Sequence, residues 1–141
     1  MNYVCAFVMD HDKNILLIRK KKPDWQAGYL NGVGGKIEFG ETIREAMNRE
    51  FFEETGITIE KHNWTYVCEL VNSNYGNSKV TFFTAKLDKF DCQNKTDEEL
   101  ELINYEVITQ YNLMPNLKAL IELTLLRLNY NGTIFCSSIS F

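Results

Sequence analysis

Short apolar runs with loose alternation occur along the chain and predict β-strands. They fall at residues 3–9, 15–19, 64–71, 79–87 and 100–107, with a further short strand expected within 33–38. Residues 116–128 instead repeat their apolar positions with the period of a helix. Strands that alternate with two helices predict an α/β fold, in which the helices pack on a mixed sheet.

A second helix is predicted over residues 43–54 from the residues at its two ends. Thr42 and Glu45 form a T-x-x-E capping box, and Gly56 stands where a helix ends on a left-handed residue. The Gly34–Gly35 pair before this segment suits close backbone approach and strained φ angles.

The predicted helix 43–54 combines an apolar beginning with an acidic end. Ile43, Ala46 and Met47 are expected to be buried. Glutamates at positions 50, 53 and 54 are spaced i, i+3, i+4 and share one face, where their like charges weaken the helix. Such a group is either an ordinary solvated acidic face or a set of oxygen ligands for a hard cation. Arg49 is expected to pair with Glu45 or Glu53, one turn away.

Residues 35–57 read GKIEFGETIREAMNREFFEETGI and fit the pattern G-x5-E-x7-R-E-U-x-E-E-x-G-U, where U is apolar. This pattern is the Nudix box, so the chain resembles the Nudix hydrolases. The resemblance covers about residues 2–128. It implies an α/β/α sandwich and the cleavage of diphosphate linkages in nucleoside diphosphate derivatives with a divalent cation.

The resemblance also implies roles for individual residues in and near the box. The Gly34 carbonyl is expected to bind metal together with Glu50, Glu53 and Glu54. Mg²⁺ suits these oxygen ligands, and Mn²⁺ fits them too. Bound ions would polarise a phosphoryl oxygen and activate an attacking water.

Two glutamates are candidates for taking the proton of the attacking water. Glu53 is the first choice within the box. Glu98, in the acidic run at residues 97–99, is the second, although that run is also typical of a solvated loop. Arg49 is placed in the catalytic site, and Gly35 and Glu41 in supporting roles.

Four residues outside the acidic group are predicted to contact substrate. The run Asn31-Gly-Val-Gly-Gly-Lys36 is similar to that of nucleoside triphosphate hydrolases that act on oxidised purines, in which the asparagine reads the base edge. Asn116 is a second base reader or a helix N-cap. Lys36 contacts phosphate or is simply exposed. Tyr75 lies close to the place, past the box, where dinucleoside polyphosphate hydrolases often carry a tyrosine.

Three aromatic residues are candidate stacking surfaces for a base, with ordinary packing as the alternative. They are Trp25, Tyr29 and Phe83. The basic run at residues 19–22 is either a solvated strand end or a cationic rim for a polyphosphate.

The first functional hypothesis is a hydrolase that converts a nucleoside triphosphate to a monophosphate and pyrophosphate. The alternative enzyme cleaves dinucleoside polyphosphates or ADP-ribose-type conjugates. A third hypothesis, from another class, is a non-catalytic nucleotide-sensing module, but such modules usually lack box glutamates that are intact here.

Length and charge set the remaining expectations. The 141 residues fit one domain, predicted over 1–129, with an extension at 130–141 that contains a possible extra strand and is compatible with a homodimer. The net charge of −4 disfavours binding to long nucleic acids. No run reaches the roughly 18 apolar residues of a membrane span. Four dispersed cysteines and the lack of a signal peptide predict a cytoplasmic protein.

Overall fold

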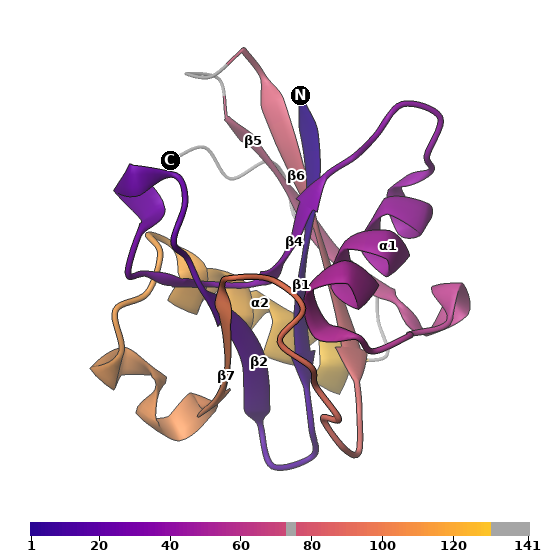
Figure 1. The fold of residues 1–141 in the computed structure, drawn as a ribbon. Coiled ribbons are helices and arrows are strands. Elements are labelled where there is room, and N and C mark those ends of the chain that lie inside the picture. Colours follow the sequence, from indigo (N-terminus) through magenta and orange to yellow (C-terminus); the bar gives the residue numbers. More distant parts are fainter. Residues whose placement is uncertain (73–75, 131–141) are drawn as a thin grey trace.

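Strand β1 (Asn2–Met9) lies at the centre of a mixed sheet (Figure 1). The computed structural model describes residues 1–72 and 76–130. Within them the strands follow the order β3-β2-β1-β6-β5, while β4 pairs with β1 and β7 with β2. The other strands are β2 (Asn14–Arg19), β3 (Leu30–Asn31), β4 (Val33–Lys36), β5 (Thr65–Asn72), β6 (Ser78–Lys86) and β7 (Glu99–Asn104). Strands β1 and β6 run parallel, and the other pairs are antiparallel.

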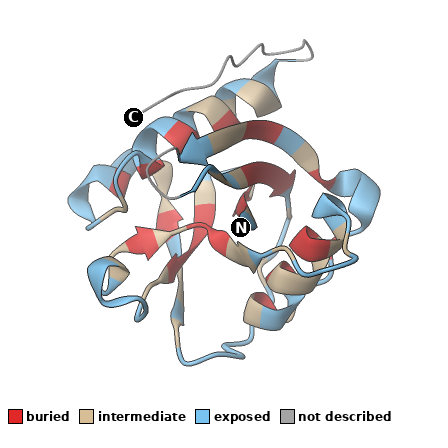
Figure 2. Cartoon of the chain, turned by 90° about the horizontal axis from the view of Figure 1, so that it is seen from above, coloured by how far each residue is buried: buried red, intermediate tan, exposed pale blue. Residues whose placement is uncertain are grey.

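Strand β1 is buried on both faces, and its alternation divides the core into two layers. Cys5, Phe7 and Met9 belong to the cluster that includes helix α2 (Leu117–Asn129). Val4, Ala6 and Val8 belong to the cluster that includes helix α1 (Ile43–Thr55). Figure 2 shows buried segments on the sheet and on parts of the helices that cover it. The predicted α/β/α sandwich is therefore confirmed.

The segment 105–107 was predicted as the end of a strand, and this prediction is wrong. Strand β7 stops at Asn104, and a 3₁₀ helix, η4 (Tyr105–Gln110), follows. The Asn104 side chain accepts a hydrogen bond from the Glu106 N–H, so it caps the new helix and ends the strand. Two shorter 3₁₀ helices are η1 (Asp24–Gln26) and η2 (Lys61–Asn63).

Two further expectations concern the C-terminal extension and membrane-spanning helices. The possible extra strand and its dimer contact fall on 131–141, outside the described residues. In the ranges 1–72 and 76–130, neither α1 nor α2 has the length and apolar character needed to cross a bilayer.

Helix α1 begins at the predicted residue, Ile43, and ends one residue later than predicted, at Thr55. Thr42 accepts a hydrogen bond from the Glu45 N–H, and the Glu45 carboxylate accepts one from the Thr42 N–H. Gly56 ends the helix at φ 73°. The predicted burial of Ala46 and Met47 is confirmed, whereas the burial predicted for Ile43 is wrong, since this first residue of the helix is 42% exposed.

We expect Thr42→Ala to lower the free energy of unfolding by about 1 kcal/mol, because two backbone N–H groups at the helix start depend on the capping box. Urea denaturation of the purified variant measures this loss. Thr42→Ser keeps the hydroxyl and should retain most of the stability. Equal losses in the two variants would contradict a capping role for the hydroxyl.

Candidate active site

Strand β4 packs closely on the acidic end of α1 and on β1 at two residues that have no side chain, Gly35 and Gly34. A Cβ atom on Gly35 would lie 2.4 Å from the Glu50 carboxylate. A Cβ atom on Gly34 would lie 2.1 Å from the Val4 carbonyl oxygen of β1. The close approach predicted for this glycine pair is confirmed, but the strained φ angles are not, since neither glycine has a positive φ.

Arg49 is the cation around which the acidic residues of this region gather. Its Nε lies 2.6 Å from one oxygen of Glu41, and its Nη1 lies 2.8 Å from Glu50 and 3.2 Å from Glu53. Nη2 donates to the second oxygen of Glu41 and to the Lys36 carbonyl. The hydrogen bond from Arg49 also holds the pKa of Glu41 below its ordinary value.

Of the two alternative partners predicted for Arg49, the structure has Glu53. The Glu53 contact is present, but the Glu45 contact is not. Glu45 instead caps α1 and pairs with Lys61 at 3.0 Å, and the N–H of Thr42 and the ammonium of Lys61 lower the pKa of Glu45 to about 2.

Glu54 differs from its neighbours because it has no contact with Arg49. Its carboxylate accepts a hydrogen bond from the Gly34 N–H at 3.2 Å. Desolvation raises the pKa of Glu54 to about 7, with Lys20 opposing the shift and Glu50 adding to it. Desolvation also raises the pKa of Glu50, against the effect of Arg49. A half-buried carboxylate with so little compensation is a position where a cation would be stabilised.

The oxygens of this region suit a hard divalent cation in type and placement. Glu50, Glu53 and Glu54 lie at the end of α1 that faces β4. In the described part of the chain, however, no three acidic, histidine or cysteine side chains converge as they stand on one ion position. Arg49 holds Glu50 and Glu53, and Gly34 holds Glu54, so the carboxylates would need to turn towards a common point to share an ion.

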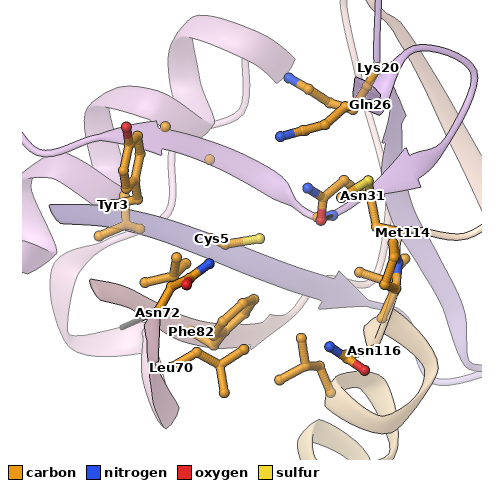
Figure 3. Close-up of a pocket in the computed structure, with 18 of the residues that line it drawn as sticks. Tyr3, Cys5, Lys20, Gln26, Asn31, Leu70, Asn72, Phe82, Met114 and Asn116 are labelled. Carbon is orange, nitrogen blue, oxygen red and sulfur yellow. Dashed lines mark hydrogen bonds between the residues drawn. The ribbon is translucent and has the colours of Figure 1, made fainter. Parts of the chain in front are cut away.

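A cavity of about 700 Å³ opens on the other side of β4 (Figure 3). Gly34 and Gly35 form part of its wall, so it reaches the strand that contacts the acidic end of α1. Cys5 and Phe82 contribute to its lining as well, from the central strands. Burial raises the pKa of the Cys5 thiol to about 12, so this thiol is neutral at physiological pH. The cavity has the mixture of apolar walls and few polar groups that is typical of small-molecule sites.

Three asparagines line the same cavity, and two of them, Asn31 and Asn116, lie at the end that is farther from Tyr3 and Asn72 in Figure 3. The Oδ1 atom of Asn31 accepts a hydrogen bond from the Gly32 N–H at 2.8 Å, which leaves its NH₂ group to donate to a ligand. Asn116 occupies the N-cap position of α2 with φ 68°, and its side chain makes no capping bond. The two amides are 85 positions apart in sequence and are brought to one cavity by the fold.

Lys20 reaches the cavity from the end of β2 and pairs with a distant glutamate. Its Nζ lies 2.8 Å from Glu98, and the second oxygen of Glu98 accepts from the N–H of Lys21 at 2.9 Å and of Lys22 at 3.4 Å. Partial burial acts to raise the pKa of Glu98, but the hydrogen bonds from these three lysines outweigh it and lower the value.

A family model described as the NUDIX domain matches residues 1–123. The chain belongs to the Nudix family. The match includes the acidic helix, the glycine strand and both asparagines.

Individual Nudix relatives match either a short part of the chain at higher identity or a longer part at lower identity. The oxidized purine nucleoside triphosphate hydrolase of Danio rerio is 47% identical over 45 residues, which is 32% of this chain and 29% of that protein. The match therefore spans less than a third of that relative's length. The uncharacterized Nudix hydrolase YvcI of Bacillus subtilis is 28% identical over 112 residues, which is 77% of this chain and 67% of that protein.

Among solved structures, the NUDIX domain of Shewanella oneidensis NrtR, complexed with ADP ribose, superposes with a TM-score of 0.78. The two chains are 20% identical, and the match covers 92% of this chain and 88% of that one. This likeness confirms the Nudix fold.

The structure brings together several of the residues predicted for a Nudix site, in two groups. Glu41, Arg49 and the box glutamates form one group beside Gly34 and Gly35. Asn31 and Asn116 form the other, within the cavity. Lys36 does not line the cavity, and only its carbonyl joins the Arg49 network. Tyr75 lies outside the described residues.

Of the three aromatic candidates, only Trp25 lines the cavity. Phe83 is buried on the opposite face of β6, where it contacts Trp64. Its neighbour Phe82 faces the cavity. The register of β6 with β1 decides between the two, because it places Phe82 beside Cys5. Tyr29 does not reach the cavity, and Lys20 was recognised in the sequence only as one of four basic residues.

The raised pKa of Glu54 predicts a pH dependence of stability in the metal-free protein. The folded state favours the protonated acid, whose ordinary pKa is 4.5, so the contribution of Glu54 to the free energy of unfolding is fully present below about pH 4.5. It declines as the pH rises and is lost above the folded pKa of about 7.

Glu54→Gln replaces this acid by a neutral group of similar shape, and we expect it to flatten the decline. Thermal unfolding in a chelator at pH 5 and pH 8 should show the variant gaining on the wild type at pH 8. The same comparison with Glu60→Gln, at an exposed glutamate before η2, supplies the control. A parallel pH response of wild type and Glu54→Gln would refute the assignment.

Proposed function

We propose that this chain is a divalent-metal-dependent hydrolase that converts a nucleoside triphosphate to a monophosphate and pyrophosphate. The observation that carries the proposal is the shared wall of β4. One side of this strand contacts the acidic end of α1, and the other borders the cavity that contains the amides of Asn31 and Asn116. A nucleotide with its base at the amides and its phosphates at Gly34 and Gly35 would place a diphosphate linkage beside the carboxylates.

The metal would be held by Glu50, Glu53, Glu54 and the Gly34 carbonyl. Mg²⁺ is the preferred ion, because these are oxygen ligands, and Mn²⁺ would also fit. When bound, the cation would polarise the phosphoryl group and lower the pKa of water. Arg49 would keep the Glu41 carboxylate in place through two hydrogen bonds.

Glu53 is the residue that we assign as general base. Its side chain is 55% exposed and has only the 3.2 Å contact with Arg49, so it is the box glutamate with the freest access to water. In the proposed step, water attacks phosphorus in line, its proton moves to Glu53, and the phosphoanhydride P–O bond breaks with release of pyrophosphate. Glu98 is the weaker candidate, because its oxygens already hold Lys20, Lys21 and Lys22.

The names of the relatives support this reaction class. The Danio rerio protein is named for oxidised purine nucleoside triphosphates. A second substrate class has support as well, since the NrtR domain was solved with ADP ribose. Hydrolysis of ADP-ribose-type conjugates is therefore the second candidate function, and dinucleoside polyphosphates belong in the same test.

A substrate panel scored by product mass separates these functions. It would contain nucleoside triphosphates, oxidised purine triphosphates, ADP-ribose and dinucleoside polyphosphates, each with Mg²⁺ and with chelator. Monophosphate plus pyrophosphate, formed only with the metal, is the expected result. Binding of nucleotides without turnover of any compound would favour a sensor instead.

We expect Glu53→Gln to lower kcat by about 10²- to 10⁴-fold, the usual contribution of a general base. Nucleotide binding, measured by calorimetry, should remain. Glu60→Gln makes the same chemical change at an exposed position and should leave kcat unchanged. Wild-type turnover by Glu53→Gln would transfer the role to another residue, with Glu98→Gln as the next variant.

The orientation of the Asn31 amide yields a separate prediction for the base. In Asn31→Asp, one oxygen can still accept from the Gly32 N–H, but the other replaces a donor by an anion. If Asn31 donates to an acceptor on the base, KM should rise about tenfold or more, because an unpaired polar contact costs about 1–3 kcal/mol. Asn129→Asp adds the same charge at the end of α2 and is the control. An unchanged KM would remove Asn31 from the base site.

A further inference from the structure

Residues 20–29 form an arm between β2 and β3 at the edge of the cavity. Its root is closed by two backbone hydrogen bonds, from the Gly28 N–H to the Lys20 carbonyl at 2.8 Å and from the Lys20 N–H to the Tyr29 carbonyl at 2.9 Å. The Glu98 carboxylate fastens the same root by holding Lys20 and Lys21. The arm is therefore anchored at its base and projects its tip, η1, beside the cavity.

The tip of the arm carries an indole that the fold does not bury. Trp25 is 67% exposed although it lines the cavity, together with Pro23 and Gln26. Trp64, the other tryptophan of the chain, is 2% exposed and packs edge-on against Phe51. A large aromatic surface left in water at the edge of a mixed polar and apolar cavity is typical of a ligand contact.

The cavity contains groups suited to different parts of a planar ligand. The amides of Asn31 and Asn116 can bond only to the edge of a base. Its faces require flat or apolar partners, and Phe82 supplies one such surface in the cavity wall. The indole of Trp25 is the exposed aromatic surface at the opening. Lys20, in the root of the same arm, lines the cavity as well, and its ammonium group is paired with Glu98.

We propose that Trp25 stacks on the base of the bound nucleotide and that the arm 20–29 is a substrate-binding element. This inference rests on the proposed function, because it requires a nucleotide in the cavity. Stacking is tolerant of base identity, since every base has a π-face. Trp25 would therefore provide affinity for bases in general, while the two asparagines discriminate among base edges.

Intrinsic fluorescence tests the stacking directly, because the chain has two tryptophans and one of them is buried. The probe is a purine nucleoside triphosphate with a methylene group between the α and β phosphorus atoms, which prevents cleavage there. We expect it to quench the wild type and to leave Trp25→Phe, whose emission comes from Trp64 alone, nearly unchanged. Inorganic tripolyphosphate offers phosphates without a base and should leave both proteins unchanged.

Steady-state kinetics supply a second readout. Trp25→Ala should raise KM by about tenfold or more with kcat little changed, as expected for loss of one base–aromatic stack. Trp25→Phe keeps a ring and should recover most of the affinity. Tyr130→Ala removes an aromatic side chain of similar exposure, 65%, from a position outside the cavity and should keep the wild-type KM.

The outcomes separate this inference from the proposed function. If calorimetry shows that the analogue binds while wild-type fluorescence is unchanged, or if the quench persists in Trp25→Phe, Trp25 is not the stacking residue. A quench by tripolyphosphate would mean that the arm responds to phosphate and not to a base. A wild-type KM for Trp25→Ala would equally overturn the inference. If neither probe binds and no nucleotide is hydrolysed, the proposed function fails and this inference fails with it.

Discussion

The contact between the glycine strand β4 and the acidic end of α1 is the constraint on which the site depends. A side chain at Gly35 would occupy the place of the Glu50 carboxylate, and one at Gly34 would collide with the backbone of β1. Gly35 thus allows the close approach of helix α1 to β4, and Gly34 allows the close approach of β4 to β1. They also leave backbone groups of β4 accessible to Glu54 on one face and to the cavity on the other.

Like-charged carboxylates do not collect on a helix without compensation, and this fold compensates them unequally. Arg49 neutralises Glu41 and contacts Glu50 and Glu53, whereas Glu54 receives one backbone N–H. The folded state therefore contains both satisfied and poorly satisfied acids within two turns of helix. This uneven compensation favours cation binding, because the Glu54 carboxylate lacks a close positively charged partner among the described residues.

The sequence was informative where the interaction is local. The capping box and the left-handed Gly56 depend on neighbours in the chain, and both were predicted correctly. Long-range geometry was not predictable in this way. Phe82 and Phe83 are indistinguishable until the register of β6 with β1 is known. Likewise, the partner of Glu98 lies 78 positions away, beyond the range of any spacing rule.

The backbone at Asn116 has a consequence for how selectivity could diverge among proteins of this design. Its left-handed conformation is one that asparagine, aspartate and glycine tolerate and most other residues avoid. The side chain contributes no capping bond to α2, so exchange among these three residues need not weaken the helix. Asparagine at this position offers the cavity a hydrogen-bond donor and an acceptor, aspartate offers an anion, and glycine offers no side chain. The left-handed backbone thus restricts ligand preference at this position to a few alternatives, and substitutions among them can change selectivity while the fold stays the same.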